Sequence, residues 1–377
     1  MNEEQDNNEI VEKELIDTSL KLMERPFNPA LIKIENKLLT IDLLIKRISQ
    51  SEPEIELNTE SYFQRKDDLW DVVKQSRLIE SILIRFPLPA FYFDGSNKNK
   101  WLVVDGLQRL SSLRNFAVKK TLKLTNLEFL TQLNGLGYDE LNRDLQRTIE
   151  ETQIVAYIIN PGTPEDVKYN IFKRINTGGL ILEPQEIRHA LNQGEPSKFI
   201  AELADLEEFK ITTISIRKER MLDRDFANRF LCFYLFGYEN YVPDLDTFMS
   251  KAMAQISKMS DVEKQKCKQD FINSMNLNHS IFGEHAFRKR MKQNERRKPL
   301  NKALFDVFSV SFAKLSDFER TQLKSKGKQV TKEFKELLNT DEVFFAAISS
   351  STGDRNRVFY RFNKIKEIID KILKEQV

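Results

Sequence analysis

The segment Asp105-Gly106-Leu107-Gln108-Arg109 combines residue types that can handle a phosphorylated ligand. A carboxylate such as that of Asp105 can bind a divalent cation or orient a water molecule. The amide of Gln108 can position a nucleophilic water, and the planar guanidinium of Arg109 can grip phosphate oxygens. The segment is short, so the same residue types also allow a plain helix cap at Asp105 and a solvated Arg109.

Two other polar clusters invite a similar interpretation. Gln64 and Arg65 stand shortly before Trp70, where they could line the rim of a pocket or simply lie on the surface. Arg174 and Asn176 precede Gly178-Gly179, and a loop with two glycines lets the backbone approach a phosphate. The same loop also suits an ordinary helix end followed by a tight turn.

The elements around the first segment predict a strand–turn–helix junction. Residues 90–93 and 101–104 are β-forming runs that flank a polar connection at 94–99, which predicts a hairpin. Asp105-Gly106 ends the second strand, and Leu107, Leu110, Leu113 and Ala117 then recur at helical spacing. The free N–H groups of a helix that starts there would favour an anion.

The remaining patterns predict an α+β chain. A short strand and a helix capped by Thr40 are expected within 36–49, a helix at 70–84, a strand at 154–159, and helices at 163–175 and 184–191. Twenty-seven phenylalanines against 12 glycines and 11 prolines favour a mostly helical body. Beyond residue 195 only helices are expected, at 197–209, 219–236, 245–257, 261–275, 283–293, 300–323, 331–349 and 355–375.

The length and composition limit which classes of protein this chain can belong to. A chain of 377 residues with 40% hydrophobic and 31% charged residues is long enough for two packed units. The two cysteines, Cys232 and Cys267, lack metal-site spacing and are expected to be buried thiols in a reducing cytosol. The acidic N-terminus and the lack of a window of ~18 apolar residues predict a soluble cytoplasmic protein without a membrane partner.

The overall charge neither favours nor excludes nucleic-acid binding, because the net charge is only +2. A basic run that includes Arg288, Arg290, Arg296 and Arg297 is either a solvated face or a weak contact with a nucleic-acid backbone. Without a recognition-helix signature, that contact would be independent of sequence.

Taken together and in order, these clusters resemble the family typified by the N-terminal domain of GmrSD-type, modification-dependent restriction endonucleases. The family's hallmark is D-G-Q-Q-R, and Leu107 replaces the first Gln here. The resemblance is specific over 63–191 and continues more weakly at 224–236 and 353–362. Its segments are FQRKDDLW (63–70), RLIESILIRFPLPAFYF (77–93), WLVVDGLQRLSSL (101–113) and FKRINTGGLILEPQEIRHAL (172–191).

The resemblance implies a small mixed-sheet domain similar to the ParB/sulfiredoxin fold. We expect an acidic extension at 1–25, this domain at 26–195 and a helical domain at 196–377. The resemblance also implies Mg²⁺-dependent binding and hydrolysis of a nucleoside triphosphate within a bacterial anti-phage defence system. Asp105, Gln108 and Arg109 would be catalytic, with Asp105 on the metal. Contacts to the nucleotide and its phosphates would come from Gln64, Arg65, Gly106, Arg174 and Asn176.

Two alternative functions stay open. The same turn could serve a nucleotide sensor without turnover that engages DNA or a separately encoded effector, and Leu107 mildly favours this. A metal-dependent DNA nuclease would need Glu183 or Glu186 beside Asp105, since two-metal chemistry uses several acids. His189, His279 and His285 do not form the signature of a His-Asn-His nuclease, so we expect no second domain of that kind.

Overall fold

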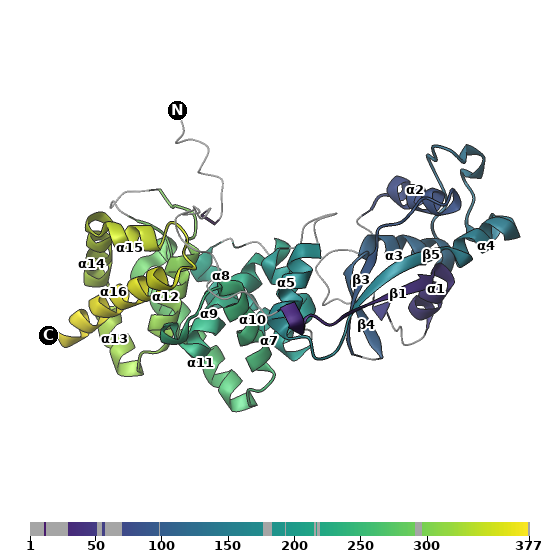
Figure 1. Ribbon diagram of the computed structural model, residues 1–377. Helices are drawn as coiled ribbons and strands as arrows, with labels where there is room; N and C mark the ends of the chain where they lie inside the picture. The colour runs from purple at the N-terminus through teal and green to yellow at the C-terminus, as the bar shows by residue number, and fades with distance from the viewer. Residues whose placement is uncertain are drawn as a thin grey trace. The chain divides into compact units, whose positions relative to one another are not determined.

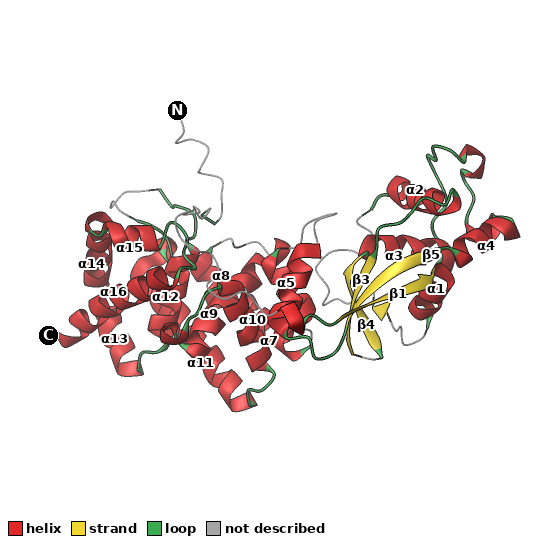
Figure 2. Cartoon of the chain, viewed as in Figure 1, coloured by secondary structure: helices red, strands yellow, loops and turns green. Residues whose placement is uncertain are grey.

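The computed structural model of the chain divides into two compact units, which we describe separately. One unit comprises Phe27–Leu191, and the other comprises Asn192–Val377 with the N-terminal residues up to Pro26. Figures 1 and 2 show the elements, and the paired strands all belong to the first unit. The predicted α+β class is therefore confirmed. The structure describes residues 11–12, 29–50, 55–56, 70–97, 99–175, 183–192, 194–214, 216, 219–290 and 296–375.

The first unit is built on a mixed five-stranded sheet in the order β1-β5-β3-β4-β2. The β3–β4 pair is the predicted hairpin, and β3 extends into the expected connection as far as Asn97. β5 matches the strand expected at 154–159, and it runs parallel to β3 and antiparallel to β1. The strands are β1 (Ile34–Thr40), β2 (Ile55–Glu56), β3 (Phe91–Asn97), β4 (Lys100–Asp105) and β5 (Gln153–Ile159).

One face of this sheet packs against four helices. Thr40 caps the first of them as predicted, because its hydroxyl accepts the Leu43 N–H at 3.4 Å. Asp71 caps the second by accepting the Lys74 N–H at 2.8 Å. The helices are α1 (Ile41–Ser49), α2 (Val72–Leu83), α3 (Leu107–Leu113) and α4 (Arg143–Glu151), and a π turn (Arg114–Val118) follows α3.

On the opposite face, a second cluster of buried residues joins the sheet to α5 (Glu165–Ile175) and α6 (Pro184–Leu191), which match the helices expected there. Because side chains alternate along a strand, Phe93 and Ile158 point to the first face while Val104 and Ile159 meet α5 and α6. The sheet therefore has a core on each side. A site at the end of β3 or β4 lies at the margin of both cores.

The second unit is helical over its described residues. Ser260 and Ser316 begin α11 and α13 in capping boxes with Glu263 and Glu319. The bounds are α7 (Glu195–Asp205), α8 (Glu207–Thr213), α9 (Leu222–Phe236), α10 (Leu245–Ile256), α11 (Asp261–Phe282), α12 (Lys302–Ala313), α13 (Asp317–Ser325), α14 (Gly327–Thr340), α15 (Glu342–Ala347) and α16 (Arg355–Lys374).

Three of the predicted long helices are each two helices. The expected 197–209, 300–323 and 331–349 break at Leu206, near Ser316 and at Asp341. The helix expected at 283–293 is wrong over its described part, since a single 3₁₀ turn at Gly283–His285 leads into irregular chain up to Arg290. Phe287 there has φ of +60°, which an α-helix does not accept.

Phenylalanine rings fill the core of the second unit. Phe226 and Phe305 meet edge to face at 4.9 Å, and Phe230 and Phe271 lie 4.5 Å apart between centroids. Cys232 and Cys267 are buried thiols that form no disulfide with each other, as predicted. Among the described residues, no helix has the length and apolar character that crossing a membrane requires.

Candidate functional site

The predicted turn lies at the strand–turn–helix junction where β4 ends and α3 begins. Asp105 is the last residue of β4, and Gly106 adopts φ of +105° before the helix starts at Leu107. A Cβ added at Gly106 would stand only 2.5 Å from Cδ1 of Phe91. Both the backbone angle and the packing therefore require glycine here. No side chain caps the first turn of α3 in the part of the chain that the structure describes.

Arg109 is buried and fully engaged with its surroundings. Its Nη2 donates to Asp105 Oδ2 at 2.7 Å and to the Ala90 carbonyl at 3.2 Å, and its Nη1 donates to the Pro89 carbonyl. Its guanidinium carbon also lies 4.4 Å from the centre of the Phe91 ring. Burial lowers the pKa of Arg109, and Asp105 opposes that shift. The guanidinium thus joins α3 to the start of β3.

Gln108 belongs to a second polar connection. Its Oε1 accepts the backbone N–H of Trp70 at 3.1 Å, and the Trp70 carbonyl accepts Nε2 of Gln75 at 2.8 Å. Asn115 in turn donates to Gln75 at 3.0 Å. This chain of hydrogen bonds holds the start of α2 against α3. Among the described residues the Nε2 of Gln108 has no acceptor, so that group can still donate to a ligand.

The carboxylate of Asp105 keeps one oxygen available. Its Oδ2 is bound by Arg109, whereas Oδ1 has no partner among the residues that the structure covers, and the side chain is 31% exposed. Magnesium in nucleotide sites is commonly held by one or two carboxylates together with phosphate oxygens and water. Asp105 fits that role as a single ligand. The described residues contain no group of three His, Cys, Asp or Glu side chains that could hold a metal by itself.

Four residues form one row across the sheet, from β1 to β4. Asn36 pairs with Tyr157, Tyr157 with Tyr92, and Tyr92 with Asp105. The two tyrosine rings stack with centroids 5.0 Å apart and planes inclined by 18°. Burial raises the pKa of Tyr92, with smaller contributions from Tyr157 and Asp105 in the same direction. The pKa of Tyr92 is thus sensitive to the charge of Asp105 in the predicted turn.

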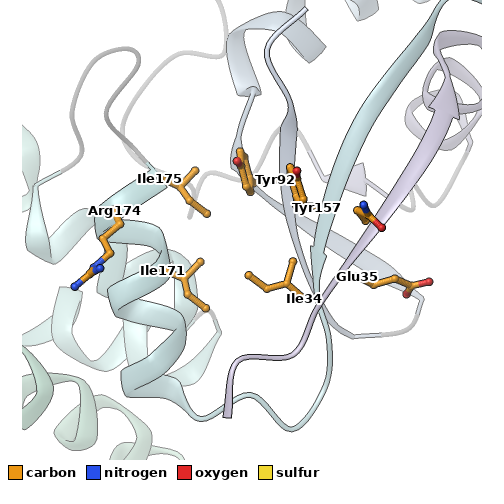
Figure 3. Close-up of a pocket in the computed structure, with 8 residues that line it drawn as sticks. Ile34, Glu35, Tyr92, Tyr157, Ile171, Arg174 and Ile175 are labelled. Atoms are coloured by element: carbon orange, nitrogen blue, oxygen red, sulfur yellow. The ribbon is translucent and has the colours of Figure 1, made fainter. Parts of the chain in front are cut away.

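An open pocket of about 840 Å³ lies over this row (Figure 3). Ile171 and Ile175 of α5 face Ile34 and the tyrosines across it, whereas Arg174 points away from the tyrosines. Tyr92 and Tyr157 were not among the residues predicted from the sequence. The available signal was alternation: each stands between two apolar residues of a predicted strand, which puts its side chain on the face opposite to theirs.

The other predicted residues are less closely grouped. Arg174 lines the pocket from α5 and is exposed, while Gln64, Arg65 and Asn176 lie outside the described residues. In the second unit, Arg296 and Arg297 are exposed and Arg290 is half-buried. Arg288 is only 3% exposed and donates to the carbonyls of Glu284, Ala286 and Thr213, so it supports the fold of that segment.

Comparison with known protein families gives a match over the first unit. Residues 42–192 match the family model described as GmrSD restriction endonuclease, N-terminal domain. Comparison with curated proteins and with solved structures returned no match. The matched range contains α1 to α6 and β2 to β5, together with the Asp105–Arg109 turn and both tyrosines of the row. Residues 42–192 of this chain are therefore similar to the N-terminal domain of GmrSD restriction endonucleases, as the sequence resemblance predicts.

Proposed function

We propose that the 42–192 domain binds a nucleoside triphosphate at the Asp105–Gly106 junction and hydrolyses it with Mg²⁺, as a module of a restriction-type defence system. One observation supports this most directly. Among the described residues, one oxygen of the partly exposed Asp105 has no partner, and no side chain caps the first turn of the helix that follows it. The unpaired N–H groups of such a turn favour phosphate oxygens.

Each residue of the turn has a distinct role in this proposal. Asp105 would hold Mg²⁺ through Oδ1, which Arg109 does not contact, and the ion would neutralise phosphate charge. The Nε2 of Gln108 donates to the water that attacks the terminal phosphate, while its Oε1 stays fixed by Trp70. Arg109 positions Asp105. Direct phosphate contacts by Arg65, Gln64, Arg174 and Asn176 are further predictions of the family resemblance.

A nucleotide sensor without turnover is the second candidate, and the surroundings of Arg109 favour it. Arginines that stabilise a phosphoryl transition state direct their guanidinium at the transferred group. The Arg109 guanidinium instead has Asp105, Pro89 and Ala90 as hydrogen-bond partners. In this version, nucleotide binding changes the affinity for DNA or for an effector protein.

The experiment measures triphosphate affinity by calorimetry and phosphate release in the presence of Mg²⁺, using the full chain. We expect Asp105→Asn to lower Mg²⁺-dependent affinity and phosphate release at least tenfold. The matched control is Asp144→Asn, which changes an exposed carboxylate in the first turn of α4 and leaves both unchanged. Binding without release, lost in Asp105→Asn, would support the sensor. Asp105→Asn behaviour identical to wild type would refute a site at this turn.

DNA binding has its own test in the second unit. Arg296 and Arg297 are exposed, so changing both to Gln should remove two phosphate contacts. The slope of log affinity against log salt concentration should then fall by about two. An unchanged slope would exclude these arginines from the DNA interface.

A further inference from the structure

The row Asn36–Tyr157–Tyr92–Asp105 connects the predicted turn to an aromatic surface. Its members come from β1, β5, β3 and β4, and each is the register partner of the next. Neighbouring strands lie about 4.8 Å apart, so Tyr157 is two strand spacings, ~10 Å, from Asp105. A nucleotide covers a distance of this order between its base and its outer phosphates.

The chemistry of the pocket suits a flat heteroaromatic ring. Its walls are the stacked rings of Tyr92 and Tyr157 on one side and Ile171 and Ile175 on the other. Ile34 at its margin is 38% exposed, which leaves an apolar surface uncovered beside the rings. Aromatic side chains bind bases by stacking regardless of base identity, because every base has a π face.

Polar groups beside the rings can form hydrogen bonds with the edge of such a ligand. Asn36 offers an amide with both donors and an acceptor, and this exposed residue lines the pocket as the register partner of Tyr157. An exocyclic amino group can donate to the Asn36 amide oxygen, and the amide nitrogen can donate to a ring nitrogen. These groups distinguish a nucleobase from an unsubstituted aromatic ring.

We propose that this pocket, lined by Tyr92, Tyr157 and Asn36, holds the base of the nucleotide whose phosphates bind at the Asp105–Gly106 junction. The inference rests on the proposed function and adds to it the site of the base. It also predicts that the Asn36 side chain, and not the turn, determines which base is preferred.

The test compares a nucleotide with its phosphates alone. Calorimetry with Mg²⁺ measures the affinity of the full chain for ATP, GTP, CTP, UTP and inorganic tripolyphosphate. We expect the best nucleotide to bind roughly 5- to 100-fold more tightly than tripolyphosphate, the range expected for stacking of one base. Tyr157→Leu should remove most of this advantage without changing the affinity for tripolyphosphate, and Tyr157→Phe, which keeps the ring, should retain it.

Two further variants complete the design. Asn36→Ala should reduce the differences among the four nucleotides while preserving their advantage over tripolyphosphate. Phe86→Leu, which changes an exposed ring of the same unit outside the pocket, should alter neither measurement. Circular dichroism and thermal unfolding establish that each variant is folded.

The outcomes separate the two proposals. Equal affinity for nucleotides and tripolyphosphate, or an advantage that survives Tyr157→Leu, would overturn the base pocket while leaving phosphate binding at the turn. Failure of both nucleotides and tripolyphosphate to bind would overturn the proposed function, and the base pocket with it.

Discussion

Arg109 donates from Nη2 to Oδ2 of Asp105 at 2.7 Å, so the last residue of β4 is tied to the first turn of α3 across the glycine between them. The same guanidinium reaches the carbonyls of Pro89 and Ala90, just before β3. One side chain therefore joins three segments. The motif that looks catalytic in the sequence is also a structural junction, and loss of function alone cannot separate these roles.

Arg109→Lys should destabilise the first unit by about 2 kcal/mol, because an ammonium group cannot reach all three acceptors and leaves at least one of the partly buried hydrogen bonds of Arg109 unmade. Urea unfolding followed by circular dichroism measures the loss. Arg77→Lys is the control, since Arg77 makes an exposed ion pair with Glu128 and should change stability little. Equal stability of the two variants would show that the Arg109 contacts are not structural.

Gly106→Ala should cost about 2–4 kcal/mol through two separate causes. Alanine disfavours φ of +105°, and its Cβ would stand 2.5 Å from the Phe91 ring. Gly135→Ala isolates the backbone cause, because Gly135 has φ of +88° but no atom lies within 4 Å of the added Cβ. It should cost only about 1 kcal/mol, from the backbone alone. A Gly106→Ala cost no larger than this would show that Phe91 moves aside easily.

The fold was predictable where the signal is local. The β3–β4 hairpin follows from two β-forming runs around a polar connection, and α1 follows from Thr40 before an amphipathic run. The strand order was not predictable, because it depends on pairing between β1 and β5, more than a hundred residues apart. The helix expected over 283–293 fails because Arg288 donates to the carbonyls of Glu284, Ala286 and Thr213 and Phe287 takes a positive φ.

The candidate site was predictable to a similar extent. The position of the Asp105–Gly106 turn follows from residue types on either side of it. The burial of Arg109 does not, because its acceptors at Pro89 and Ala90 lie about twenty residues earlier in the chain. The Tyr92–Tyr157 stack depends on the register of two strands that are far apart in sequence, which composition and periodicity do not determine.

Glu80 should make the stability of the first unit depend on pH. Its buried carboxylate accepts the backbone N–H groups of Glu128, Phe129 and Leu130 at 3.0, 2.7 and 2.7 Å. Burial raises the pKa of Glu80, but these hydrogen bonds outweigh burial and the net pKa is lowered. A lowered pKa means that the contribution is present above the unfolded value near 4.3 and is lost as the pH falls through the folded value.

Glu80→Gln should therefore reduce the free energy of unfolding by about 1–2 kcal/mol at pH 7. The difference from wild type should shrink as the pH falls from 5 toward 3.5, which urea unfolding at several pH values measures. Glu151→Gln is the control, because Glu151 is 73% exposed and only 3.9 Å from Arg147 in a weak ion pair. A difference for Glu80→Gln that stays constant over this range would contradict the assigned role of its charge.

Asp306 should be among the most sensitive positions of the second unit. It is fully buried and accepts from Arg229 Nε at 2.8 Å, Arg229 Nη2 at 2.6 Å and Arg361 Nη2 at 3.2 Å. Burial disfavours the charge of Arg229, yet Asp306 outweighs burial and raises the pKa of that guanidinium. The carboxylate thus joins α9, α12 and α16 through two buried cations.

Asp306→Asn should destabilise the second unit by about 3–5 kcal/mol, because both buried arginines then lose the negative charge that their guanidinium groups contact. Asp317→Asn is the control, because Asp317 is 96% exposed in its ion pair with Arg320 and should cost little. Thermal unfolding of the full chain gives the comparison. The double variant Arg229→Met with Asp306→Asn should recover part of the loss, because it removes one of the two buried positive charges. No recovery would show that the cost arises from packing and not from charge.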